Sequence, residues 1–124
     1  VLDFHHLGSA GEPEELPATN PDFAEALLGT LDAASGFAQG VHASVPGPQY
    51  ETPAELEVLA RAGASTGSMS PASELRAARE AGLEAVVLLV VTNAGTATHA
   101  QVLEASEAAR EVLTRPLAAL ASVW

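Results

Sequence analysis

The side chains best suited to chemistry lie in one stretch of the chain, residues 47–55, with the sequence GPQYETPAE. Tyr50 and Glu51 stand at its centre, between an alternating run at residues 40–45 that predicts a strand and a helix start at residues 52–55. Proteins of the α/β class place ligands at the carboxyl ends of strands. An aromatic ring beside a carboxylate suits a flat heterocycle with ring N–H donors. The alternative is a surface tyrosine and glutamate on an ordinary loop, and local spacing leaves both interpretations open.

The helix that follows has clear signals at both ends. Thr52 can cap it, Pro53 suits its first position, and Glu55 can reach back to complete a capping box. Gly63 predicts its end, because glycine readily adopts the left-handed conformation that closes a helix. Three residues of this helix are predicted to be buried: Leu56, Leu59 and Ala60.

Two other connections carry polar or polarisable side chains after predicted strands. Met69 and Ser70 follow a short segment, and Ser70 before a proline predicts the cap of a helix that ends at Gly82. Asn93 follows residues 83–91, which are apolar on both faces, as a central parallel strand should be. Because the carboxyl ends of parallel strands share one edge of a sheet, these connections and the Tyr50–Glu51 connection predict a site there.

The rest of the chain completes an alternation of strands and helices. Residues 1–7 predict a strand end, and a helix begins at Asn20 and Pro21. Thr98 and Gln101 predict a second capping box, for a helix that runs to about residue 114 and is kinked or ended by Pro116. The first helix has an apolar stripe made of Phe23, Leu27 and Leu31. The glutamates of the loop before it predict a solvated segment: Glu12, Glu14 and Glu15.

This order predicts an α/β fold with a mostly parallel sheet flanked by helices. A chain of 124 residues fits a single domain, 1–124, or the C-terminal portion of a larger one. The apolar start at residues 1–7, without a methionine, favours a piece from the middle of a longer protein.

Composition excludes several classes of function. The chain is 48% hydrophobic and 17% charged, which is typical of a globular protein. Its 16 acidic and 5 basic residues give a net charge of −11, which repels nucleic acid and anionic membranes. The absence of cysteine excludes disulfides, thiolate metal sites and cysteine nucleophiles. Because the longest apolar run is too short to span a bilayer, we expect a soluble, cytoplasmic protein.

Three motifs in order resemble the trimeric purine nucleoside phosphorylase family, within the nucleoside phosphorylase superfamily. Residues 47–55 are similar to its purine-binding signature. The pairs at 63–64 and 69–70, with Glu74, are similar to its next motif, and residues 92–103 to its third. The resemblance runs from Gly40 to about residue 113. It implies a nucleoside-phosphorylase-like fold that is incomplete here, with its N-terminal half missing.

The resemblance implies a role for each candidate residue. Glu51 would accept hydrogen bonds from purine ring N–H groups, and Tyr50 would pack on the base. Asn93 would donate to N7 and the six-position oxygen, which favours 6-oxopurines and stabilises the departing purine anion. Met69 would lie against the ribose and Ser70 would contact phosphate. His99 would reach the ribose 5′-hydroxyl, and His42 stands where the family usually has a tyrosine near the ribose, so it could donate instead.

The implied reaction is that of a pentosyltransferase: phosphorolysis of inosine- or guanosine-type nucleosides to free base and ribose 1-phosphate, as in purine salvage. Inorganic phosphate is the co-substrate, and no metal or organic cofactor is implied. The family's glycine-rich phosphate loop lies in an N-terminal portion, which this chain would need. A homo-oligomer is implied, a trimer whose neighbouring subunit closes the sugar pocket with a phenylalanine; Phe23 is a candidate, or a core residue.

Each of these residues also has an ordinary structural interpretation. Met69 alone suits a core filler, Ser70 a helix cap, Asn93 a turn, and His99 a surface helix position. Two alternatives to the enzyme therefore remain: a catalytically inactive paralogue that binds purines, and a structural domain of the same fold.

Overall fold

The structure, a computed structural model, describes residues 1–7, 13–16, 25, 29 and 37–123. The stripe of the predicted helix from Asn20 and the acidic residue Glu12 lie outside these residues. The chain forms two compact units, which we describe separately. Unit 1 comprises Val1–Thr19 and Gly40–Val87, and unit 2 comprises Asn20–Gln39 and Leu88–Trp124.

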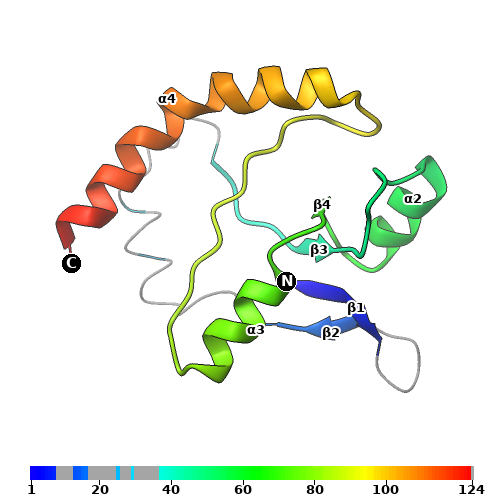
Figure 1. Ribbon diagram of the computed structural model, residues 1–124, viewed down its shortest axis with the longest axis horizontal. Helices are drawn as coiled ribbons and strands as arrows, with labels where there is room; N and C mark the ends of the chain where they lie inside the picture. Colours follow the sequence, from blue (N-terminus) through cyan, green and yellow to red (C-terminus); the bar gives the residue numbers. More distant parts are fainter. Residues whose placement is uncertain (8–12, 17–24, 26–28, 30–36, 124) are drawn as a thin grey trace. The chain divides into compact units, whose positions relative to one another are not determined.

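Unit 1 contains a four-stranded sheet, shown in Figure 1, in the order β2-β1-β3-β4. Its strands are β1 (Leu2–Leu7), β2 (Pro13–Glu15), β3 (His42–Ser44) and β4 (Thr66–Ser68). Strand β1 pairs antiparallel with β2 and parallel with β3, and β3 pairs parallel with β4. The predicted α/β class with a mostly parallel sheet is confirmed, and so are the strands predicted at the start of the chain and within residues 40–45.

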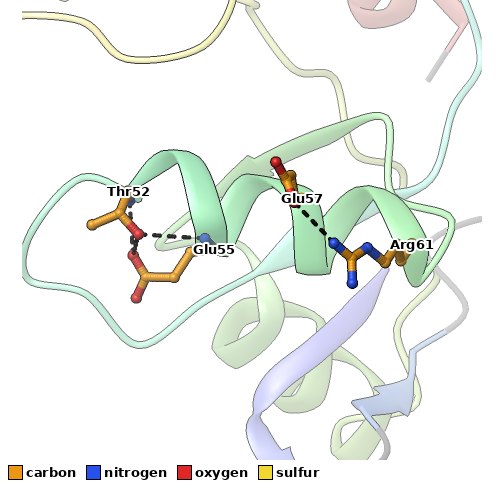
Figure 2. A network of polar contacts seen from close by, with 4 residues as sticks. All are labelled: Thr52, Glu55, Glu57 and Arg61. Atoms are coloured by element: carbon orange, nitrogen blue, oxygen red, sulfur yellow. Dashed lines mark hydrogen bonds and ion pairs between the residues drawn. The ribbon is translucent and has the colours of Figure 1, made fainter.

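Helix α2 (Pro53–Arg61) connects β3 to β4 and begins at the predicted capping box. The Thr52 N–H donates to Glu55 Oε2 at 2.7 Å, and the Glu55 N–H donates to Thr52 Oγ1 at 3.3 Å (Figure 2). One turn further on, Arg61 pairs with Glu57 at 2.8 Å on the exposed face of the helix. The sequence therefore determines the start of this helix through contacts within four residues.

The end of α2 also agrees with the prediction. Gly63 has a φ of 91°, its N–H donates to the Ala60 carbonyl at 3.0 Å, and the Ala64 N–H donates to the Leu59 carbonyl at 3.0 Å. These two bonds define a Schellman motif. Of the three residues predicted to be buried, Leu59 is buried, Leu56 is half-buried and Ala60 is exposed. Leu56 lies between Leu59 and Ala60 around the helix, and Ala60 stands about 100° from Leu59, so the buried side of the helix is centred on Leu59 and does not reach Ala60.

Helix α3 (Ala72–Glu80) begins differently from the prediction, because Ser70 does not cap it. Pro71 is the cap residue and makes no side-chain capping bond. Instead the Ala72 N–H, one of the unpaired donors of the first turn, donates to Ser44 Oγ at 3.4 Å. The prediction was wrong because the cap comes from a strand distant in sequence. The predicted end at Gly82, with a φ of 67°, is confirmed.

Two of the glutamates predicted to lie in a solvated loop belong to a strand instead. Glu14 and Glu15 are part of β2, where they lie opposite Asp3 and Leu2 of β1. Glu14 is also ion-paired, to Arg76 at 3.0 Å. The prediction failed because pairing with β1 and an arginine on α3 outweigh the local preference of acidic residues for a loop.

The core of unit 1 is small. Leu16, Ala72 and Leu75 are buried together, so the residue that follows β2 shares one apolar contact region with α3. The backbone groups of Val1 and Leu16 extend the β1–β2 pairing: the Val1 ammonium donates to the Leu16 carbonyl and the Leu16 N–H to the Val1 carbonyl, both at 2.8 Å. Three half-buried side chains pack against this core: Val1, Ala85 and Val87.

The apolar run at residues 83–91 contradicts the strand prediction. None of its residues belongs to a strand in the described structure, and Leu83 and Val91 are 66% and 68% exposed. Ala85 and Val87 do pack against the core of unit 1. The apolar pattern indicated a tendency to be buried, but a strand also requires a neighbouring strand with free backbone groups. No such neighbour pairs with this run in the described part of the chain.

Unit 2 contains the long helix α4 (His99–Val123) (Figure 1). Its predicted capping box is confirmed: the Thr98 N–H donates to Gln101 Oε1 at 2.9 Å and the Gln101 N–H to Thr98 Oγ1 at 3.4 Å. Of the two effects predicted for Pro116, the ending of the helix near residue 114 is wrong, because the helix continues through Pro116 to Val123. A proline removes one N–H from the helix but leaves the other backbone bonds on either side. No helix among the described residues is long and apolar enough to cross a membrane.

Candidate functional site

The connections that follow β3 and β4 leave from the same edge of the sheet. The two strands are parallel and in register, with His42 opposite Thr66 and Ser44 opposite Ser68. The Val45 N–H extends this pairing by donating to the Ser68 carbonyl at 2.9 Å. The predicted meeting of the Tyr50–Glu51 and Met69–Ser70 connections therefore follows from the topology of unit 1.

His42 is buried at this edge, with 4% of its surface exposed. Its Nδ1 lies 2.9 Å from Thr66 Oγ1, and its Nε2 lies 3.0 Å from Ser68 Oγ and 2.7 Å from the Ser70 carbonyl oxygen. A carbonyl can only accept, so Nε2 carries the proton and Nδ1 is left to accept from the Thr66 hydroxyl. For the neutral imidazole, this network therefore selects the tautomer protonated at Nε2.

The pKa of His42 is lowered from its ordinary value of 6.5. Burial is the largest cause, because it disfavours the charged imidazolium. The hydrogen bond to the Ser70 carbonyl and the carboxylate of Glu51 act in the opposite direction, whereas the terminal ammonium of Val1 lowers the pKa further. His42 is therefore mainly neutral at pH 7, in agreement with the tautomer that its neighbours require.

Glu51 carries an unsatisfied acceptor. Its Oε1 has no solvent exposure and no hydrogen-bond partner among the residues that the structure describes. Buried polar atoms are nearly always hydrogen-bonded, and a carboxylate oxygen accepts bonds from N–H and O–H groups. A ligand N–H placed beside Oε1 would satisfy it.

Met69 and Ser70 lie on the connection that follows β4. The Met69 side chain lies against Gly47, whose φ is 62°, so the two connections touch. The Ser70 N–H donates to Ser68 Oγ at 3.3 Å, and the Ser70 carbonyl also accepts from the Ser68 hydroxyl at 2.6 Å. The Ser70 hydroxyl itself has no partner within the described residues. Tyr50 is 47% exposed.

Asn93 and His99 belong to unit 2. Asn93 follows the run at 83–91 and lies in a turn, where its Oδ1 accepts from the Thr92 hydroxyl at 2.9 Å and its Nδ2 donates to the Gly95 carbonyl. The amide keeps one N–H that this turn does not use. His99 is the first residue of α4 and is exposed. The structure thus groups the remaining five candidates in unit 1: His42, Tyr50, Glu51, Met69 and Ser70.

The sequence analysis missed the two hydroxyls that contact His42. Thr66 and Ser68 are two residues apart in β4, so their side chains share one face of the sheet, next to the strand that carries His42. The alternation of small hydroxyl residues at 66, 68 and 70 was the available signal. It becomes meaningful only when the register with β3 is known.

A hollow of about 720 Å³ lies on unit 2 and is distinct from the candidate residues. It is an open feature along α4 with charged sides, and none of the candidate site residues that the structure describes is among its lining. The described residues that line it all belong to this helix: Glu104, Glu107, Ala108, Arg110 and Thr114.

The family model of the phosphorylase superfamily matches residues 3–122, and the chain belongs to that superfamily. The purine nucleoside phosphorylase of Mycobacterium tuberculosis is 44% identical over 93 residues, which are 70% of this chain and 34% of that relative. That of a Cellulomonas species is 43% identical over 89 residues, 67% of this chain and 32% of the relative. Purine nucleoside phosphorylase 1 of Bacillus subtilis is 33% identical over 75 residues, 56% of this chain and 28% of the relative. The resemblance predicted from the motifs is confirmed, and the chain spans about a third of the length of these relatives.

Proposed function

We propose that this chain forms the purine side of a purine nucleoside phosphorylase site. The observation that carries this proposal is the buried, unpaired Oε1 of Glu51 at the edge where two connections meet. A 6-oxopurine has a ring N–H that could donate to this oxygen and so supply the missing hydrogen bond. The names of the similar proteins support the same substrate class.

The proposed reaction is phosphorolysis of a purine nucleoside. A phosphate oxygen attacks C1′ of the ribose, the bond from C1′ to the base breaks, and its electron pair leaves with the purine. Ribose 1-phosphate and, after protonation, the free base are the products. Asn93 would stabilise the leaving anion by donating to N7 and the six-position oxygen. No metal or organic cofactor takes part in this scheme.

The other candidates complete the proposed pocket. Tyr50 would pack on the base and Met69 on the ribose, while the hydroxyl of Ser70, which has no partner among the described residues, would donate to phosphate. His99 would contact the 5′-hydroxyl. The active assembly in this proposal is a cytoplasmic homo-oligomer, a trimer, completed by an N-terminal portion that holds phosphate. Phe23, the candidate from a neighbouring subunit, lies outside the described residues.

The arginines of the chain favour such a second portion. Arg61 pairs with Glu57 at 2.8 Å, and Arg110 pairs with Glu107 at 3.1 Å. Arg76 lies 3.0 Å and Arg79 3.7 Å from carboxylate oxygens of the glutamate in β2. These four of the five arginines are thus engaged with acidic groups, which disfavours their use as phosphate ligands. The same observation favours the second candidate, a paralogue that binds purines without turnover.

The test is a calorimetric titration of the chain with hypoxanthine, with and without phosphate. We expect Glu51→Gln to weaken binding about tenfold or more. A carboxylate can accept through either oxygen, whereas the amide has one oxygen and one NH₂ group, and the bond to the ligand N–H would no longer be to a charged acceptor. Asn93→Ala should weaken it by a similar factor. Glu57→Gln, on the exposed face of α2, is the matched control and should bind as the parent does. Equal affinity of the parent and Glu51→Gln would overturn the assignment.

Turnover separates the two candidate functions. The chain is incubated with inosine and phosphate, alone and with a polypeptide that covers the N-terminal part of a similar phosphorylase, and hypoxanthine release is measured. Release that depends on phosphate and on Glu51 supports the enzyme. Purine binding without release in either mixture supports the non-catalytic paralogue.

A further inference from the structure

We propose that His42 is a positioning residue that holds the turn at Ser68–Ser70, and that it does not contact the substrate. Through this turn it holds the backbone that carries Met69 and Ser70, and Met69 lies against Gly47 of the connection that carries Glu51. The identity of the ligand rests on the proposed function, whereas the role of His42 in the turn rests on the contacts of unit 1 alone.

The first argument is that both ring nitrogens of His42 are already used. Nδ1 has the Thr66 hydroxyl at 2.9 Å, and Nε2 has the Ser70 carbonyl at 2.7 Å and Ser68 Oγ at 3.0 Å. With 4% of its surface exposed, the ring offers no free nitrogen to a ribose hydroxyl. A substrate contact would require one of these bonds to break.

The second argument is that all three partners lie on β4 and the turn that follows it. Met69 stands between Ser68 and Ser70, the two residues that Nε2 bridges. The Ser68 hydroxyl also donates to the Ser70 carbonyl at 2.6 Å, so the imidazole and this hydroxyl converge on one oxygen. A rigid ring that spans β3 and the turn fixes the backbone on which the proposed ligand contacts are carried.

The third argument is electrostatic coupling to the ligand acceptor. The Glu51 carboxylate favours the charged form of His42, and the Val1 ammonium disfavours it. The two β4 side chains that contact the His42 ring, Thr66 and Ser68, are neutral. On the other neighbouring strand, β1, the acidic residue Asp3 pairs in register with Ser44 of β3. A ligand N–H bound to Glu51 Oε1 and a proton on His42 would therefore compete for the same negative charge. Ligand binding should weaken as His42 becomes protonated.

The matched variants are His42→Gln and His42→Phe. A glutamine amide can place an N–H near the position of Nε2 and preserve the bond to the Ser70 carbonyl, whereas phenylalanine keeps the bulk and removes both bonds. In the parent chain, ¹⁵N NMR of the ring should show a neutral imidazole protonated at Nε2 at pH 7.5. It should titrate below the ordinary value of 6.5.

Hydrogen exchange of the Ser70 amide, which donates to Ser68 Oγ, reports on the turn. We expect exchange about five- to tenfold faster in His42→Phe and close to the parent rate in His42→Gln. The Leu56 amide in α2 should be unchanged in both, which shows that the fold is intact. An Nδ1-protonated ring, or equal Ser70 exchange in all three chains, would overturn the proposal.

A titration with hypoxanthine at pH 8 and pH 5.5 then tests the link to the ligand. The parent should bind several-fold more weakly at pH 5.5, His42→Gln should bind as the parent does at pH 8 without that pH dependence, and His42→Phe should bind weakly at both. The loss of binding at pH 8 in His42→Gln would contradict the positioning role. If no chain binds hypoxanthine, the proposed function fails for the isolated chain, and the ring and exchange measurements still decide the role of His42.

Discussion

Thr52 and Glu55 exchange hydrogen bonds across the first turn of α2, at 2.7 Å and 3.3 Å between the backbone nitrogen of each residue and a side-chain oxygen of the other (Figure 2). A third bond joins the Thr52 hydroxyl to Glu55 Oε2 at 2.7 Å. Glu51, the proposed ligand acceptor, directly precedes this box. The capping box therefore fixes the point at which the connection from β3 enters the helix, and with it the position of the Glu51 backbone.

Replacing the cap should loosen this connection. We expect Thr52→Ala to reduce the free energy of unfolding by about 1 kcal/mol, a typical loss for an N-cap. Thr52→Ser should retain most of it, because the hydroxyl remains. Urea unfolding followed by circular dichroism measures the difference. Glu57→Ala, at an exposed position of the same helix outside the capping box, is the control, and an equal loss there would mean that the box has no special role.

The same box predicts a pH dependence. The hydrogen bonds from Thr52 lower the pKa of Glu55 below its ordinary value of 4.5. A carboxyl with a depressed folded-state pKa adds stability that is present above pH 4.5 and is lost as the pH falls through the folded-state pKa. The protection of the Leu56 amide, that is the exchange rate of an unfolded chain at the same pH divided by the rate of this amide, should therefore fall in this acid range. In Glu55→Gln, which keeps an acceptor but does not titrate, this part of the pH dependence should disappear.

His42 should produce a separate effect nearer neutral pH. Its folded-state pKa lies below 6.5, so between these two values the unfolded chain binds more protons than the folded one. The titration of His42 should therefore leave the free energy of unfolding unchanged above pH 6.5 and lower it as the pH drops below that value. Urea midpoints measured from pH 7.5 to 5 should show this slope in the parent and a flatter one in His42→Gln. A slope of the same size in both chains would assign it to other groups.

The parts of the fold that the sequence predicted correctly depend on contacts between close neighbours. The capping boxes at Thr52 and Thr98 join residues three apart, and Gly63 and Gly82 close helices through their own left-handed φ. Such signals need no knowledge of the rest of the chain. They also placed Glu51 correctly, because it stands between a short strand and a capped helix.

The parts that the sequence did not predict depend on distant partners. The first turn of α3 is capped by Ser44, which is 28 residues away, and Glu14 joins a strand because β1 lies beside it. The run at 83–91 has the composition of a strand and no strand beside it in the described part of the chain. For the candidate site, the contacts of His42 became visible only once the register of β3 and β4 was known.

The Glu14–Arg76 pair offers a test of the unpredicted strand β2. Their side chains are 37% and 29% exposed, and the pair connects β2 to α3 at 3.0 Å. We expect a double-mutant cycle with Glu14→Gln and Arg76→Gln to give a coupling of about 0.5–1 kcal/mol, the upper range for partly exposed pairs. Glu107 and Arg110 also form an ion pair, but each side chain is 76% exposed, and this pair should give a coupling near zero. Equal couplings would mean that the β2 contact adds nothing beyond a surface ion pair.

Gly47 should show two separable penalties when it is replaced by alanine. Its φ of 62° disfavours any side chain by about 1–2 kcal/mol, and a Cβ there would lie 2.5 Å from Met69 Sδ and 2.9 Å from Met69 Cγ. In unfolding experiments, Gly47→Ala should therefore lose more than Gly63→Ala, where the φ is 91° and nothing lies within 4 Å of the added Cβ. Adding Met69→Ala to Gly47→Ala should restore the stability lost to the clash with Met69 and leave the loss caused by the positive φ. Adding Met69→Ala to Gly63→Ala should restore no stability. Additive losses in both backgrounds would show that the two connections do not touch in solution, and that Met69 is not held against Gly47.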